Sequence, residues 1–116
     1  MRVLLVEHDD GVRRSLQLQL NGWGFVVRSF ASPGLALADP SSIEADVLLV
    51  DGSFVSAPDR PDGIPQALRR RGWQGRAILM SAAAEDISNG VAGCAGFAAV
   101  VRNPPRHGEL LAALGR

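Results

Sequence analysis

The chain has 116 residues, which is enough for one domain with a buried core. Hydrophobic residues make up 47% and charged residues 21%, a balance that excludes an intrinsically disordered chain. The formal net charge is zero, so overall charge gives no reason to expect nucleic acid or an anionic membrane as a partner.

The single cysteine, Cys94, excludes an internal disulfide and favours a reducing compartment. The apolar runs are too short to span a membrane, and no signal-peptide pattern precedes the first predicted strand. We therefore expect a cytoplasmic domain that does not enter a membrane.

Strands and helices are predicted in strict alternation. Short apolar runs bounded by turn residues predict strands, and apolar residues recurring every three or four positions predict helices. Strands are expected at Val3–Val6, Phe25–Phe30, Val47–Val50, Ala77–Met80 and Ala98–Arg102. Helices are expected at Asp10–Leu20, Pro33–Ala38, Gly63–Arg71, Ala84–Ala92 and Arg106–Leu114.

Cap and breaker residues set the boundaries of these elements. Asp10 is expected to cap the first helix and Asn21-Gly22 to end it. Ser32 before Pro33 opens the second helix, and Asp39–Ser42 breaks it. Residues 52–62 are longer than the usual strand-to-helix connection, which favours a functional or a loosely ordered loop.

The alternation contains no repeat and no linker, and it predicts one α/β domain with a parallel sheet covered on both faces. Two of the strands open directly into acids. Val3–Val6 is followed by Glu7-His8-Asp9-Asp10, and Val47–Val50 is followed by Asp51. Because ligands of such folds bind at the carboxyl ends of the strands, we expect an acidic site around Asp51.

The order of these motifs over the whole chain resembles the receiver domain of bacterial two-component response regulators. The likeness rests on the opening strand with its acids, Asp51, Ser81 after the fourth strand, Gly96 before the fifth, and Asn103-Pro104 after it. The resemblance implies a flavodoxin-like, doubly wound (βα)5 fold with strand order 2-1-3-4-5. It also implies that residues 1–116 form a single receiver-like domain without an attached output domain, as either a stand-alone regulator or a fragment of a larger one.

The resemblance assigns roles to particular positions. Asp51 stands at the phosphoacceptor position, and Ser81 stands at the position of the switch hydroxyl. A Mg²⁺ ion would be held by Glu7, Asp51 and the backbone carbonyl of Ser53, because hard cations take oxygen ligands. Asn103 stands where the family has a lysine, and the bond to Pro104 is expected to be cis, which would hold the Asn103 side chain over Asp51.

The sequence departs from the family at the residues that handle the phosphoryl group. His8 replaces the second acid, so the further metal ligand is expected to be either His8 itself or Asp9, which lies one residue further along and would need a small loop adjustment. Imidazole suits zinc, copper or nickel better than magnesium, so Mg²⁺ is expected to bind weakly. The chain has no lysine at all, and Val100 replaces the switch aromatic.

These departures favour an interaction module that no longer depends on phosphate and signals through protein–protein contacts, with a histidine kinase or another signalling protein as partner. A conventional receiver, phosphorylated on Asp51 by a histidine kinase, is the alternative. The predicted helix 84–92, weakened by Gly90 and Gly93, would form the partner face with the fifth strand and the last helix. The same face could support a homodimer.

Enzymatic roles are less favoured. Aspartyl-nucleophile phosphatases need a second acid, where this chain has Ser53, and they also need a lysine. A flavin-binding module shares the sheet order, but no phosphate-cradling loop follows the first strand. Arg69–Arg71 is expected to form a solvated helix end rather than a phosphate or nucleic-acid site. Trp23 and Trp73 are expected to be packing anchors.

Overall fold

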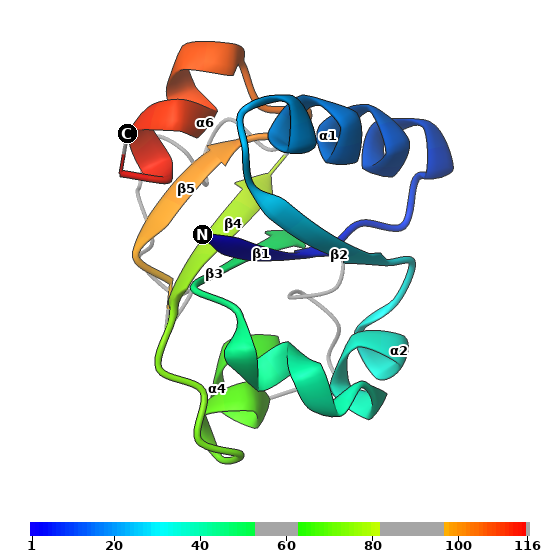
Figure 1. The fold of residues 1–116 in the computed structure, drawn as a ribbon, viewed down its shortest axis with the longest axis vertical. Helices are drawn as coiled ribbons and strands as arrows, with labels where there is room; N and C mark the ends of the chain where they lie inside the picture. Colours follow the sequence, from blue (N-terminus) through cyan, green and yellow to red (C-terminus); the bar gives the residue numbers. More distant parts are fainter. Residues whose placement is uncertain (53–62, 82–96, 116) are drawn as a thin grey trace.

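The computed structural model describes residues 1–52, 63–81 and 97–115. Within these residues five parallel strands form one sheet in the order β2-β1-β3-β4-β5, as the sequence predicted (Figure 1). The strands are β1 (Arg2–Val6), β2 (Val26–Phe30), β3 (Val47–Asp51), β4 (Arg76–Ser81) and β5 (Ala99–Arg102). The helices are α1 (Asp10–Gly22), α2 (Pro33–Ala38), η1 (Pro40–Glu44), α4 (Gly63–Arg69) and α6 (His107–Ala113).

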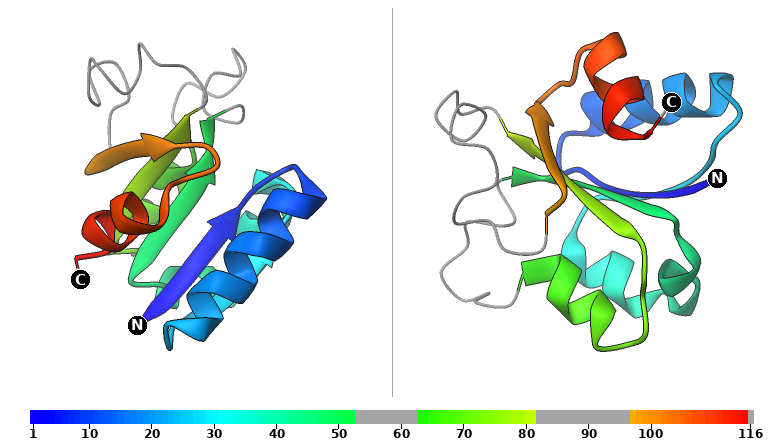
Figure 2. Two further views of the ribbon diagram at one scale, coloured as in Figure 1. Left: turned by 90° about the horizontal axis from the view of Figure 1, so that it is seen from above. Right: turned by 90° about the vertical axis from the view of Figure 1, so that its left-hand side faces the viewer.

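Helices cover both faces of the sheet. α1 and α6 lie on one face, and α2 and α4 lie on the other (Figures 1 and 2). Side chains alternate between the faces along each strand. In β1, Val3 and Leu5 join the core under α1 and α6, while Leu4 and Val6 join the core against α2 and α4. Burial on both faces is why the central strands read as continuous apolar runs.

The first helix has different caps from those expected. Asp9, not Asp10, is the N-cap, and its carboxylate accepts a hydrogen bond of 2.9 Å from the backbone N–H of Val12. At the other end, the helix continues through Gly22, and the reversal falls at Gly24, whose φ is +92°. The left-handed region favours glycine, so the second glycine, not the first, provides the turn.

The segment after α2 is a 3-10 helix, η1, where the sequence predicted only a break. Asp39 caps it by accepting from the N–H and the hydroxyl of Ser41, at 2.9 and 2.8 Å. These two hydrogen bonds hold the pKa of Asp39 below its usual value. An Asp-Pro pair followed by serines is a helix-start signal, so the residues that end α2 also begin η1.

Both tryptophans pack as expected, on opposite faces of the sheet. Trp73 is buried against the α2 and α4 side, and its indole N–H donates to the carbonyl of Ala45 at 2.8 Å. Trp23 packs on the α1 and α6 side. The centroids of its ring and of the His107 ring are 4.4 Å apart, and the two rings meet edge to face.

Some of the expected features fall outside the described residues. These are the carbonyl of Ser53, the helix expected at 84–92, Cys94 and Gly96. In the part of the chain that the structure describes, no helix has the length and apolarity needed to cross a membrane.

Candidate functional site

Two buried carboxylates meet at the carboxyl edge of the sheet. Val6 of β1 pairs with Val50 of β3, so Glu7 and Asp51 occupy the next positions on neighbouring strands. The N–H of Glu7 continues the ladder by donating to the carbonyl of Phe30 at 3.1 Å. Glu7 is 1% exposed and Asp51 is 4% exposed. The register of two apolar strands therefore places two acids side by side and out of water, as the sequence predicted for this edge.

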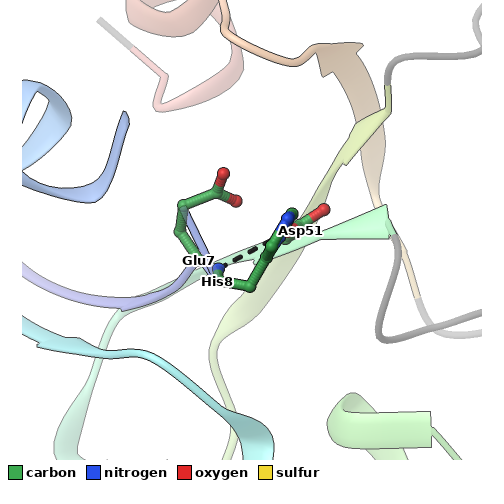
Figure 3. A group of neighbouring side chains, drawn as sticks. All are labelled: Glu7, His8 and Asp51. Atoms are coloured by element: carbon green, nitrogen blue, oxygen red, sulfur yellow. Dashed lines mark hydrogen bonds and ion pairs between the residues drawn. The ribbon is translucent and has the colours of Figure 1, made fainter. Parts of the chain in front are cut away.

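His8 reaches the same carboxylate from the solvent side. Its ring Nδ1 contacts Oδ2 of Asp51, and its backbone N–H donates to the same oxygen at 3.5 Å (Figure 3). The His8 side chain remains 59% exposed, whereas that of Asp51 is 5% exposed. The hydrogen bond and the charge of Asp51 raise the pKa of His8 above its ordinary value.

Asn103, the residue directly after β5, contacts both carboxylates. Its side-chain N–H₂ donates to Oε2 of Glu7 at 3.5 Å and to Oδ1 of Asp51 at 3.4 Å. The Asn103-Pro104 bond is cis, as predicted, and the backbone N–H of Asn103 donates to the carbonyl of Ser81 at 3.0 Å. The prediction that Asn103 lies over Asp51 is confirmed. Each carboxylate has one oxygen on this amide, which leaves Oδ2 of Asp51 facing His8.

The electrostatics of the site follow from burial of two acids together. The pKa of Glu7 is raised from 4.5 to about 7, first by loss of hydration, and then by a hydrogen bond with Asp51 and by the charge of Asp51. The hydrogen bond from Asn103 opposes this shift by favouring the ionised form. Between these two pKa values Glu7 therefore holds a proton that an ordinary glutamate has lost.

Other predicted residues are placed as follows. Ser81 is buried at the end of β4, one residue beyond Met80, which pairs with Asp51. Asp9 caps α1 with one of its carboxylate oxygens, and the cluster of possible ligand atoms among the described residues consists of Glu7, His8 and Asp51. Val100 packs partly buried on the α2 and α4 side, as an aliphatic residue without a ring to move.

Arg102 does not take the place of the missing lysine. Its guanidinium lies 3.6 Å from Glu109, and its backbone N–H donates to the same carboxylate at 2.8 Å. A strand residue one position from Asn103 points to the other face, as the sequence indicated.

Arg13 is a contributor that the sequence reading missed. Its guanidinium donates to the carbonyl of Glu7 at 3.0 Å and to Asp10 at 2.5 Å. It ties the first turn of α1 to the segment that carries Glu7 and His8. Its place one turn into the helix after an acid cluster is the signal that could have found it.

Among the described residues, Glu7, His8 and Asp51 each offer a ligand atom, and these atoms lie within 4.8 Å of one another. The set contains two oxygens and one nitrogen. Mg²⁺ demands octahedral oxygen ligands and is poorly matched by an imidazole. The side chains described here therefore fit the family's magnesium ion poorly.

No protein-family model matches the sequence, and no curated protein matches it. Solved structures with the same fold do exist. The receiver domain of a Francisella response regulator aligns over 98% of this chain and 93% of its own, with 17% identity and a TM-score of 0.74. The chemotaxis protein CheY4 of Vibrio cholerae aligns over 99% and 96%, with 20% identity and a TM-score of 0.73.

The response regulator TrrA of Thermotoga maritima, solved in complex with Mg²⁺ and BeF, aligns over 98% of this chain and 96% of its own, with 18% identity and a TM-score of 0.73. The TM-scores of these alignments establish the fold. The sequence identities are too low to establish a function, which has to be inferred from the residues of this chain. The chain has the fold of the response-regulator receiver domains, with the strand order that they share.

Proposed function

We propose that this chain is a receiver module of two-component signalling that acts through protein–protein contacts and is not an enzyme. In this proposal its output does not depend on phosphorylation of Asp51. The observation that carries it is the occupation of the Asp51 carboxylate by two side chains of the chain itself, His8 and Asn103. The proposal places the module in the cytoplasm.

A phosphoryl group on Asp51 would find little to hold it. The chain has no lysine to contact the phosphoryl oxygens, and Asn103 brings a neutral amide instead. A modification shifts a conformational equilibrium only by its differential interaction with the two states. With Val100 in the aromatic position, the usual coupled ring movement is also absent. The unphosphorylated protein therefore already presents, in this proposal, the surface that binds its partner.

The conventional receiver is the second candidate, and it is supported by Asp51, Glu7 and Ser81, which stand buried at the carboxyl edge of the sheet. Incubation with a small phosphodonor and Mg²⁺, read by intact mass, separates the two. We expect no phosphoryl adduct on this chain under conditions that modify a conventional receiver domain. An adduct that Asp51→Asn abolishes would support the conventional candidate.

Partner binding provides the second test. The proposed partner face includes β5 and α6, so we expect Arg102→Glu to abolish binding to a cognate histidine kinase or signalling protein in a pull-down. Asp51→Asn should leave binding nearly unchanged. Arg28→Glu is a matched control, because Arg28 is also an exposed, ion-paired arginine but lies on β2 at the opposite edge of the sheet. Loss of binding in Asp51→Asn alone would contradict the proposal.

A further inference from the structure

We propose that Glu7, His8 and Asp51 form a binding site for a divalent transition-metal ion of the zinc class, in place of the magnesium ion that the fold implies. This inference concerns ion selectivity and does not depend on the proposed signalling role. It starts from the disagreement between the donor atoms present and those that Mg²⁺ requires.

The three side chains are neighbours at the carboxyl edge of the sheet (Figure 3). Their ligand atoms all lie within 4.8 Å of one another. Ligands bound to a single Zn²⁺ at about 2.0–2.2 Å are separated from each other by about 3–4 Å. A small rearrangement is needed, in which the His8 ring moves away from Oδ2 of Asp51 so that the ion fits between them, and the His8 side chain is 59% exposed to solvent. Three protein ligands leave a fourth position for water, as in open zinc sites.

The chemistry of the donors selects the ion. One imidazole nitrogen and two carboxylate oxygens suit Zn²⁺, Ni²⁺ or Cu²⁺, whereas Mg²⁺ keeps several waters and prefers oxygen throughout. Two adjacent buried carboxylates repel each other when both are ionised, and a divalent cation between them removes that repulsion. His8 gives the ion a route in, because it borders solvent while Glu7 and Asp51 form the buried floor.

Asn103 provides the outer support that such sites need. Its amide holds Oε2 of Glu7 and Oδ1 of Asp51, and Oδ2 of Asp51 is left facing the ring nitrogen of His8. Hydrogen bonds of this kind orient carboxylate ligands and tune their affinity. An ion bound here would exchange the direct contact between His8 and Asp51 for two metal bonds.

The test is a titration of the purified protein with Zn²⁺ by calorimetry, with and without a millimolar excess of Mg²⁺. We expect one Zn²⁺ to bind and Mg²⁺ to leave its affinity unchanged. His8→Asn should lower the Zn²⁺ affinity by at least about 10-fold. The chain has only two histidines, so His107→Asn on α6 is the matched control and should bind as the parent does.

A second measurement locates the ion independently of any variant. Co²⁺ in place of Zn²⁺ should shift the NMR signals of the His8 ring strongly and leave those of His107 in place. Equal Zn²⁺ affinity in the two histidine variants, displacement by Mg²⁺, or binding that disappears only in Cys94→Ser would overturn the inference. The phosphorylation and pull-down experiments do not enter this test, so failure of either proposal is recognised separately.

Discussion

Glu7→Gln should make the protein more stable at neutral pH, by an amount that depends on pH. The substitution keeps the shape of the protonated side chain and removes the acid whose pKa rises from 4.5 to about 7 on folding. Between these values the native state holds a proton that the unfolded chain has lost, so the stability of the parent falls as pH rises. The glutamine of the variant does not titrate, so the stability of the variant does not decrease with pH for this reason.

The size of the effect follows from the two pKa values. One unit of pKa corresponds to about 1.4 kcal/mol, so the interval from 4.5 to about 7 corresponds to about 3 kcal/mol once the pH exceeds both values. The gain of Glu7→Gln over the parent is expected to be below about 1 kcal/mol at pH 5 and to approach about 3 kcal/mol at pH 8. The raised pKa of His8 also makes stability fall as pH rises, but it does so in the parent and in the variant alike, so it does not contribute to the difference between them.

The assay is urea unfolding at pH 5, 6, 7 and 8 in the presence of a chelator, so that bound metal does not contribute. Glu44→Gln is the control, since Glu44 is exposed and its ion pair with Arg2, at 3.7 Å, is worth less than about 1 kcal/mol. A Glu7→Gln protein destabilised to the same degree at every pH would refute the reasoning, because it would mean that Glu7 is ionised in the native state at all these values.

Three further outcomes are expected. Mg²⁺ should not saturate the protein in the low-millimolar range by NMR, and His8→Asp should strengthen its binding; tight binding by the parent would contradict this. Gly75→Ala should lower the thermal midpoint, because a Cβ there would lie 2.7 Å from the ring of Trp73, while Gly22→Ala, with nothing within 4 Å, should not. Trp73→Phe should cost about 1 kcal/mol or more in chemical denaturation, since it leaves the carbonyl of Ala45 without its donor; an unchanged midpoint would argue against that bond.

The sheet could be predicted from the sequence because burial on both faces leaves a strong signal. Runs such as Val47–Val50 carry that signal with no polar interruption, and no end of an observed strand differs from the predicted end by more than one residue. Helix ends were less predictable. Asp9 and Asp10 are both good cap residues, and only the path of the chain decides which one meets the N–H of Val12.

The positions of the acids in the site could be predicted from the sequence. The hydrogen bonds that link them to other residues were harder to predict. The positions of Asp51 and Glu7 at the ends of their strands follow from the apolar runs that precede them, and those runs are local features of the sequence. The contact of His8 with Asp51 joins residues 43 positions apart, and its exposed ring reads in sequence as an ordinary loop histidine. The role of Asn103 depended on the receiver resemblance, since an Asn-Pro pair alone predicts only a turn.

Because Trp23 and Trp73 lie on opposite faces of the sheet, they are intrinsic fluorescence probes of the two helix layers. With no tyrosine in the chain, ultraviolet emission comes essentially from these two indoles. Trp73 is 2% exposed, which predicts blue-shifted emission that reports on the layer beneath α2 and α4. Trp23 is half-buried against the ring of His107, so its emission reports on the α1 and α6 layer. Single-tryptophan variants would therefore let the loosening of each layer be followed separately in one unfolding experiment.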